Sequence, residues 1–385
     1  MRQNKAPMRV LFWSAPFWPQ IGGVEIFAAN LLPALRERGY EFAVVAARDL
    51  TDLPEEDRFG GIPVYRFPFS TALTNNDLDQ IIAIRRQITK LKRSFAPNLV
   101  HVNSFSPGVL FHLDTASGCP VPLLFTLHGD TYKQAVERNS LLDKTLRKAA
   151  LVTACSAAAM ERSRQAAGEL VFRSSVIYNG IEVPPLAPEP LTFNPPRLLC
   201  LGRLAPEKRF HLALSALSLL SKRYPNVRLV IAGDGPTRTE LERQTVELGL
   251  TNVVEFTGWI APEKVPALIN TATAVVMPSR KEGLPLVALE AALMARPIVA
   301  TWVGGMPEVV VHQQTGLLVE PENSAELAEA IVCLLDRPEI ATRMGQSGRQ
   351  RTQEVFSWKR CVDSYDAVYR QLITNASHNY LSSAE

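Results

Sequence analysis

Residues 273–292 read TAVVMPSRKEGLPLVALEAA and join an apolar run to a polar loop and a second apolar segment. The β-branched start of this stretch predicts a buried strand. Gly283 and Pro285 predict that a helix follows, because proline is tolerated in a first turn, where its N–H is not needed. We therefore expect Glu282 on the loop at the carboxyl end of the strand and Glu290 about two turns into the helix.

Both carboxylates can line one crevice in this arrangement. The segment Gly283-Leu284-Pro285-Leu286 lies between them and supplies backbone N–H groups at a helix start, where anions bind. A phosphate site flanked by two hydroxyl-accepting carboxylates suits a sugar nucleotide. The plainer alternative is that glutamate is common near helix N-termini because it complements the helix dipole.

The same stretch resembles the E-x7-E donor-site signature of retaining glycosyltransferases of the GT-B fold, in particular family 4. The resemblance rests on the Glu-Gly-Leu-Pro opening that starts at Glu282 and on the Leu-Glu-Ala close around Glu290. The later run Gly304-Gly305-Met306-Pro307-Glu308 also fits the pattern of that family. The likeness covers nearly the whole chain.

Composition agrees with a two-domain α/β protein. The chain has 385 residues, of which 46% are hydrophobic, and this length suits two domains of about 180 residues each. A net charge of +3 is too small to indicate nucleic-acid binding. Five cysteines without C-x-x-C spacing suit reduced thiols in a cytoplasmic protein. The sequence contains no run of about 18 apolar residues, so we expect no membrane-spanning helix.

Short apolar runs alternate with amphipathic stretches, which is typical of parallel βα units in doubly wound sheets. The expected strands end at or near Ser14, Val45, Asn103, His128, Cys155, Gly202, Gly233, Phe256, Pro278 and Thr301. Polar residues and glycines gather at these carboxyl ends, the edge that carries ligand sites in such sheets.

Proline density suggests the boundaries between the parts of the chain. Residues 183–196 are rich in proline and predict a stiff linker. We expect an acceptor-side Rossmann-like domain over residues 1–182 and a nucleotide-sugar domain over 197–355. Apolar residues at helical spacing predict a terminal helix over 356–375, which by the resemblance crosses back to the first domain. GT-B architecture places the two domains face to face across a cleft.

Two cations follow the expected strand at 197–201. Arg203 and Lys208 lie in the sequence GRLAPEK, where a guanidinium and an ammonium can hold phosphate oxygens and stabilise a leaving diphosphate. Ordinary surface ion pairs are the alternative. The sequence resembles the G-R-L-x-x-x-K diphosphate clamp of the family, which Arg209 does not match.

Two further segments of the second half resemble nucleotide-bordering loops of the family. Gly233 opens a G-x-G-P sequence that lacks the third glycine of a dinucleotide fingerprint. Ile260 closes the run Phe256-Thr257-Gly258-Trp259-Ile260, which resembles the segment whose backbone contacts the base. A plain turn explains that run equally well.

Candidate site residues of the first half follow two expected strands. Gly22 and Gly23 precede a helical pattern, so their backbone suits contact with sugar or diphosphate, or simply a tight turn. His128 closes an apolar run before Gly-Asp and resembles the cleft histidine that contacts the transferred sugar, although a lone histidine is usually structural. Asp130 could hold that histidine or meet the acceptor hydroxyl.

Metal-bound diphosphate would require a D-x-D sequence on a loop at a strand end. Asp77-Leu78-Asp79 has these letters, but a helical pattern follows it, so it predicts a helix cap. Histidine, cysteine and carboxylate residues show no spacing typical of metal ligands. We therefore predict an enzyme that needs neither a metal ion nor another cofactor.

Residues 81–95 combine an apolar stripe with a strongly basic remainder. The favoured interpretation is a helix that packs on a sheet and exposes its basic face to solvent. The alternative is attraction to anionic lipid, worth up to about 1 kcal/mol per basic residue. A glycosyltransferase with a lipid-linked acceptor would benefit from such peripheral contact at the inner face of the membrane.

The resemblance implies a retaining, metal-independent glycosyltransferase. It would move a hexose-type sugar from a nucleoside-diphosphate sugar, with UDP favoured over GDP, to a hydroxyl acceptor in polysaccharide or glycolipid synthesis. It assigns Glu290 to the ribose, Glu282 to the sugar, and Arg203 and Lys208 to the diphosphate. A GT-B nucleotide-sugar epimerase and a binding protein without transfer activity are the alternatives.

Overall fold

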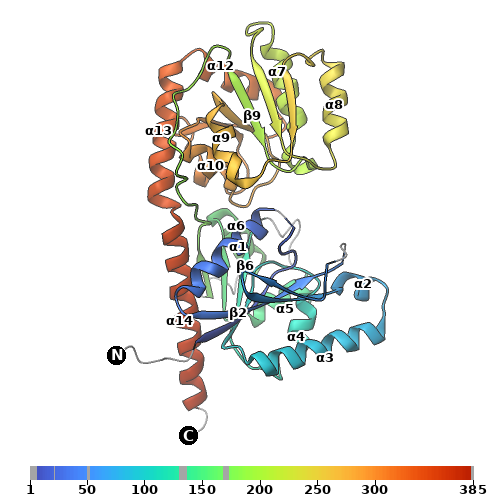
Figure 1. Ribbon diagram of the computed structural model, residues 1–385. Helices are drawn as coiled ribbons and strands as arrows, with labels where there is room; N and C mark the ends of the chain where they lie inside the picture. The colour runs from blue at the N-terminus through green and yellow to red at the C-terminus, as the bar shows by residue number, and fades with distance from the viewer. Residues whose placement is uncertain (1–6, 21, 50–52, 130–136, 168–172, 383–385) are drawn as a thin grey trace. The chain divides into compact units, whose positions relative to one another are not determined.

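A computed structural model describes residues 7–20, 22–49, 53–129, 137–167 and 173–382. The chain divides into two compact units. The first consists of Met1–Tyr178 and Arg360–Glu385, and the second is Asn179–Lys359. Each is an α/β unit with helices on both faces of a mainly parallel sheet, as the sequence predicts (Figure 1).

The sheet of the first unit has eight strands in the order β3-β4-β2-β1-β5-β6-β7-β8. They are β1 Met8–Trp13, β2 Tyr40–Ala47, β3 Glu56–Phe59, β4 Ile62–Phe67, β5 Leu99–Val102, β6 Leu123–Leu127, β7 Leu151–Ala154 and β8 Ser174–Val176. All pairings are parallel except that of β3 with β4. The strand order reverses between β1 and β5, and such a switch point is where ligands bind in these sheets.

Helices cover both faces of this sheet. They are α1 Gly23–Arg36, α2 Phe69–Thr74, α3 Leu78–Phe95, α4 Val109–Asp114, α5 Leu141–Lys148, α6 Ala157–Ala166 and α14 Trp358–Ser382. Alternate strand residues such as Leu11 and Val100 pack with α2 to α6 in one apolar cluster. On the other face Phe27 of α1 meets Tyr365 of α14, with 5.7 Å between the ring centroids.

The sheet of the second unit has six strands in the order β11-β10-β9-β12-β13-β14, all parallel. They are β9 Arg197–Leu201, β10 Arg228–Ala232, β11 Val254–Gly258, β12 Ala274–Met277, β13 Ile298–Thr301 and β14 Gly316–Val319. Here the strand order reverses between β9 and β12. The two strands are direct neighbours although β10 and β11 separate them in the sequence.

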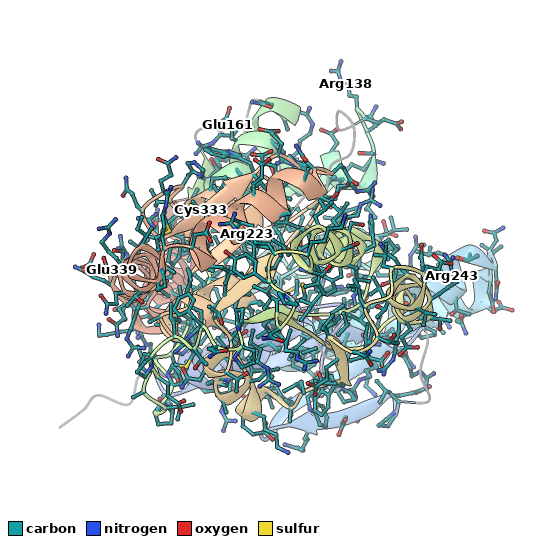
Figure 2. All side chains as sticks on the ribbon, turned by 90° about the horizontal axis from the view of Figure 1, so that it is seen from above. Arg138, Glu161, Arg223, Arg243, Cys333 and Glu339 are labelled. Atoms are coloured by element: carbon teal, nitrogen blue, oxygen red, sulfur yellow. The ribbon has the colours of Figure 1, made fainter. Side chains whose placement is uncertain are left out.

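The second unit is wound in the same way. Its helices are α7 Phe210–Leu220, α8 Arg238–Glu247, α9 Val265–Asn270, α10 Leu286–Leu293, α11 Met306–Val309, α12 Ser324–Leu335 and α13 Pro338–Val355, with 3-10 turns η2 Pro206–Lys208 and η3 Pro262–Lys264. Residues of α7, α8, α12 and α13 share one apolar cluster with alternate strand residues. Polar side chains such as Arg243 of α8 and Glu339 of α13 project outward (Figure 2).

Every strand that the sequence predicts is present and ends at or near the expected residue. The strands that the sequence did not reveal are β3, β4, β8 and β14. Two of them read EDRF and SSV, so they lack the apolar run on which the prediction depends. Both of these polar strands lie at a sheet edge and are largely unburied.

The proline-rich residues 183–196 form neither a helix nor a strand. Side chains of the second unit hold them. Asn270 Nδ2 donates to the carbonyl of Ala187 at 2.8 Å, and the buried Arg296 guanidinium donates to the carbonyl of Glu189. Together with the bond of the Thr273 hydroxyl to the carbonyl of Thr192, these contacts dock residues 187–192 on the second unit.

Helix α3 contains the basic segment 81–95 and packs its apolar stripe on the sheet. Ile84, Ile88 and Leu91 are buried in the cluster of the first unit. Asp77 caps the helix, because its side chain accepts from the backbone N–H of Gln80 at 3.0 Å. The D-x-D letters are thus a helix cap, as predicted. Within the described ranges, no helix is long and apolar enough to cross a membrane.

Candidate functional site

Lys208 and Glu282 meet at the switch point of the second unit. Because β9 and β12 are parallel neighbours, the segments that follow them emerge at the same sheet edge. The backbone N–H of Arg280 donates to the carbonyl of Glu207 at 2.8 Å and ties the two segments together. Lys208 Nζ then lies 2.7 Å from Glu282 Oε1, an ion pair between residues far apart in the sequence.

Glu282 is the more buried partner, with 7% of its side chain exposed against 23% for Lys208. Its Oε1 also accepts from Ser279 Oγ at 2.6 Å. Both bonds use the same oxygen, and in the described part of the chain no group donates to Oε2. That oxygen is free to accept from a ligand hydroxyl.

The loop around Glu282 is held from the neighbouring strand. The Thr301 hydroxyl donates to the carbonyl of Ser279. Gly304 has φ +51°, and a Cβ there would lie 1.8 Å from the carbonyl oxygen of Glu282, so only glycine fits. The sequence did not single out Ser279 or Thr301. The position of Ser279 three residues before a candidate carboxylate was the signal available for it.

Helix α10 begins at Leu286, with Pro285 as its cap residue. The expectation that Pro285 lies in the first turn and that Glu290 lies about two turns inside the helix was therefore wrong. Glu290 is about one turn from the start. The reason is that residues 280–285 form a loop tied to distant segments, since Arg280 N–H donates to the Glu207 carbonyl and Gly305 N–H donates to the Glu282 carbonyl.

Part of the Glu290 residue is accessible to solvent, but its carboxyl group is surrounded by protein atoms. Burial raises the pKa of its carboxyl to about 7. No cation or hydrogen-bond donor contacts this carboxyl among the residues that the structure describes. Glu290 therefore differs from Glu282, whose charge is neutralised by Lys208.

Backbone donors lie between the two carboxyls. The N–H groups of Gly283, Leu284 and Leu286 have no acceptor in the described ranges, and Pro285 has no N–H. They precede or open α10, so the positive end of the helix dipole adds to their attraction for an anion.

Arg203 lies in the same segment as Lys208 but is exposed. Its guanidinium donates to Glu207 Oε1 at 2.8 Å, and 69% of its side chain is accessible. Gly233 has φ +134°, and a Cβ there would lie 1.9 Å from the carbonyl oxygen of Gly202, so it lets two strand ends approach. Ile260 is half-buried just beyond β11.

The first unit brings its candidate residues to the sheet edge beyond β1, β5 and β6. Gly22 and Gly23 form the start of α1, which follows β1. His128 follows β6, and its Nε2 lies 2.9 Å from Asn103 Oδ1. Burial lowers the pKa of His128 to about 4, so its imidazole is neutral. Asp130 lies outside the described residues.

No group of three or more histidine, cysteine and carboxylate side chains is arranged to hold a metal ion in the described ranges. The metal-independent mechanism remains a prediction. The cations and backbone donors near Glu282 are the groups available for an anionic ligand in the second unit.

Comparison with known proteins identifies the family. The family model described as glycosyl transferases group 1 matches residues 187–351, and the one described as glycosyltransferase family 4 matches residues 21–184. Glycogen synthase of Mycobacterium tuberculosis strain H37Rv is 30% identical over 397 residues, which cover 94% of each protein. A GDP-mannose-dependent alpha-(1-6)-phosphatidylinositol monomannoside mannosyltransferase of that organism is 34% identical over 170 residues, covering 42% of this chain and 44% of the relative.

Solved structures show the same fold. Sucrose-phosphate synthase from Thermosynechococcus elongatus superposes with a TM-score of 0.80 at 22% identity, covering 96% of this chain and 100% of that one. Anabaena HepE in complex with UDP-glucose has a TM-score of 0.75 at 22% identity, covering 95% of this chain and 100% of that one. By sequence and by fold, the chain belongs to glycosyltransferase family 4, the group 1 glycosyltransferases, and is a sugar-transferring enzyme of the GT-B fold.

Proposed function

We propose that the protein is a retaining glycosyltransferase that moves a hexose-type sugar from a UDP-sugar to a hydroxyl acceptor in polysaccharide or glycolipid synthesis. The observation that carries the proposal is the buried ion pair of Glu282 with Lys208, which lies beside Glu290, a carboxyl that no described cation or donor contacts. The cation and the free backbone donors suit the diphosphate of a nucleotide sugar. The two carboxyls, which differ in charge, suit the hydroxyls of its sugar and its ribose.

Lys208 supplies positive charge where the diphosphate would leave. Negative charge grows on the leaving group during transfer, so a fixed cation stabilises the transition state more than the ground state. Arg203 is exposed, and among the described residues Glu207 alone pairs with it, so its guanidinium can turn toward the phosphates at little cost. The N–H groups of Gly283, Leu284 and Leu286 would bind further phosphate oxygens.

Glu282 is assigned to the transferred sugar. Its Oε1 is occupied by Lys208 and Ser279, and its Oε2 remains to accept from a sugar hydroxyl. Departure of the diphosphate leaves oxocarbenium character on the sugar, and an oxygen of the diphosphate then helps to deprotonate the acceptor hydroxyl. This course retains the anomeric configuration.

Glu290 is assigned to the ribose. A carboxyl without a partner and with a raised pKa gains from accepting hydrogen bonds, and ribose presents two adjacent hydroxyls. His128, Gly22 and Gly23 are assigned to the sugar side of the site in the first unit, and Asp130 to His128 or the acceptor.

One solved structure supports UDP as the nucleotide of the donor, whereas a group of sequence relatives favours GDP. Anabaena HepE was crystallised with UDP-glucose and aligns over nearly the whole chain. The GDP-mannose-dependent mannosyltransferases align over less than half of it. We therefore place UDP-sugars first and GDP-sugars second.

A ligand screen followed by a transfer assay tests the proposal. The full chain is heated with each nucleotide sugar, and a true donor at 100 times its Kd should stabilise the fold by about 2.7 kcal/mol. The stabilising donor is then incubated with hydroxyl acceptors, and release of the nucleoside diphosphate is followed. Binding without any release, with or without acceptor, would contradict the enzymatic assignment of the site.

The two glutamates are separated by calorimetry with free UDP. Glu290→Gln should weaken free UDP about 10- to 150-fold, the range for losing a charge-assisted hydrogen bond. Glu282→Gln should leave free UDP binding unchanged and impair sugar transfer. Equal weakening of free UDP by both variants would refute this division of roles.

We also propose peripheral membrane contact through α3. Leu78 and Ile82 are 65% and 44% exposed, and Arg86, Lys90 and Arg93 follow them on the accessible side of the helix. These basic side chains line one groove together with Arg85, which pairs with Asp114. An apolar end beside cations that pair with no carboxylate of the described residues suits an anionic lipid surface.

Vesicle sedimentation tests this contact. The protein should bind vesicles that contain phosphatidylglycerol and not vesicles of phosphatidylcholine alone. Arg86→Glu with Lys90→Glu should abolish binding, whereas the same reversal at Arg223 in the second unit should not. Equal vesicle binding by both variants would show that the basic residues of α3 are not the ones that bind the lipid.

A further inference from the structure

Three polar residues form a hydrogen-bonded chain beside the switch point of the first unit. Ser14, Asn103 and His128 directly follow the neighbouring strands β1, β5 and β6. Ser14 Oγ donates to the carbonyl of Pro16 at 3.0 Å. Asn103 Nδ2 donates to Ser14 Oγ at 3.3 Å, and Asn103 Oδ1 lies 2.9 Å from His128 Nε2.

The direction of this chain follows from counting hydrogens. A hydroxyl has one proton, and that of Ser14 is donated to the Pro16 carbonyl, which can only accept. The Ser14 oxygen must then accept from the amide nitrogen of Asn103. The amide oxygen of Asn103 is thereby turned toward His128 and can only accept from it.

His128 consequently carries its proton on Nε2. Burial keeps the ring neutral, since it lowers the pKa to about 4. A neutral imidazole has one N–H, so Nδ1 presents a lone pair. The amide of Asn103 therefore decides which ring nitrogen is left to accept a hydrogen bond.

Nδ1 is buried, and in the described ranges no donor contacts it. The ring of Phe27 packs on one side of the imidazole, with 5.0 Å between centroids. The nearby His101 shows the contrasting case, because Tyr369 and Thr126 engage its two ring nitrogens at 2.6 and 2.8 Å. An orphaned buried acceptor is costly unless a ligand satisfies it, so His128 differs from a structural histidine.

We propose that Asn103, held in place by Ser14, is a positioning residue that fixes His128 as the tautomer whose Nδ1 accepts a hydrogen bond from the donor sugar. This inference rests on the proposed function, which places His128 against the transferred sugar. A sugar hydroxyl can donate to that lone pair, whereas a sugar carboxylate would face it with another lone pair. The site therefore selects neutral sugars over uronic acids at this position.

Nitrogen NMR of the full chain tests the tautomer directly. The protein is labelled with [15N]histidine, and the signals of His128 are identified by their loss in His128→Gln. We expect a protonated Nε2 and an unprotonated Nδ1 at neutral pH. A protonated Nδ1 in the wild-type protein would overturn the inference.

Variants test the role of the amide. Asn103→Ala should mix the two tautomers, whereas Asn103→Asp should restore the original one, because a carboxylate also accepts from Nε2. Ser104→Ala is the matched control. Ser104 is the next residue after Asn103, and its hydroxyl donates to the carbonyl of Ala15 at 3.4 Å, but it takes no part in the hydrogen bonds that link Ser14, Asn103 and His128. An unchanged tautomer in Asn103→Ala would show that Asn103 does not fix it.

Kinetics separates this inference from the proposed function. With UDP-glucose as donor, Asn103→Ala should lower kcat/KM about threefold to tenfold, the range for one neutral hydrogen bond. It should add little to His128→Gln, because both changes remove the same interaction. UDP-glucuronate should not serve as donor. Wild-type kinetics in His128→Gln would overturn the proposed role of His128, and an impaired His128→Gln beside an unimpaired Asn103→Ala would overturn this inference alone.

Discussion

The candidate site of the second unit contains charges that are already paired, whereas that of the first unit contains a neutral acceptor that no described donor contacts. Glu282 is buried and neutralised by Lys208, and His128 is buried with no donor from the described residues at Nδ1. A buried unpaired charge costs far more than a buried unpaired neutral acceptor, which costs about 1–3 kcal/mol. A buried carboxylate therefore requires a counter-ion within the protein, whereas a neutral imidazole can be buried without a hydrogen-bond donor at a smaller cost.

Glu290 represents a third arrangement within the same molecule. It is a carboxyl in protein surroundings without a partner, and its pKa of about 7 reduces the cost by admitting a proton. Pairing, neutrality and protonation are thus three ways in which this chain lowers the cost of burying a polar group.

Lys208→Ala breaks the paired arrangement and should have the largest effect. Removing one partner of a buried ion pair typically destabilises a fold by about 3–5 kcal/mol, because the remaining charge is left uncompensated. Turnover should also fall about 10²- to 10³-fold through loss of a preorganised charge. Urea unfolding and steady-state kinetics measure the two effects.

Two variants sharpen this result. Lys208→Ala combined with Glu282→Gln should recover most of the stability and none of the activity, because no buried charge remains. Arg203→Ala should reduce turnover but change stability by no more than about 0.5 kcal/mol, since its ion pair is exposed. A large loss of stability in Arg203→Ala would contradict the contrast between the two cations.

Glu290→Gln should stabilise the free enzyme at alkaline pH. The folded pKa of about 7 lies above the ordinary value of 4.5, so the folded state holds an extra proton between these values and stability falls as pH rises through this window. At pH 8 the carboxylate costs at most about 3 kcal/mol, which glutamine avoids.

Thermal unfolding from pH 5 to pH 8 checks this prediction. The stability difference between Glu290→Gln and the wild-type enzyme should be small at pH 5 and grow toward pH 8. A constant difference across this range would show that the carboxyl titrates normally and that it is not held in the third arrangement.

Arg209→Gly should leave both activity and stability nearly unchanged. Arg209 has φ +52°, a left-handed conformation that costs a side-chain-bearing residue about 1–2 kcal/mol and glycine almost nothing. Its ion pair with Glu322 is partly exposed and contributes little. Stability should therefore rise by no more than about 1 kcal/mol, as measured by urea unfolding.

Ser218→Gly, in the last turn of α7, is the matched control and should cost about 0.5 kcal/mol, because serine is itself a weaker helix former than alanine. The turnover of Arg209→Gly should stay within about twofold of the wild-type value, because the guanidinium pairs with Glu322 and does not join Lys208 at Glu282. A drop comparable to that of Lys208→Ala would add Arg209 to the paired charges of the site.

Chelation should have the smallest effect. EDTA should leave turnover unchanged, because Lys208, Arg203 and the backbone donors before α10 supply the positive charge that a metal would otherwise provide. The assay is the transfer reaction with and without EDTA. Loss of activity that Mn²⁺ or Mg²⁺ restores would show that the resident cations are insufficient.

The strands and their polar ends were largely predictable because they depend on local pattern. Runs such as residues 197–201 and 273–277 are apolar and end at glycine or polar residues, and the structure has strands there. The polar strands β3 and β8 were missed for the opposite reason. The start of α10 was misplaced because the preceding loop is bonded to distant segments, for example by Gly305 N–H donating to the Glu282 carbonyl.

From the sequence alone follow the two Rossmann-like folds, the family, and the position of Glu282 at a strand end, since hydrophobic periodicity and glycine placement are properties of neighbouring residues. Tertiary structure decided which of these residues meet. Lys208 reaches Glu282 only because β12 pairs with β9 across the sheet, and Asn103 reaches His128 only because β5 pairs with β6. Strand order arises from packing of the whole sheet, so the charge state and the tautomer of a site residue depend on partners that its own segment does not specify.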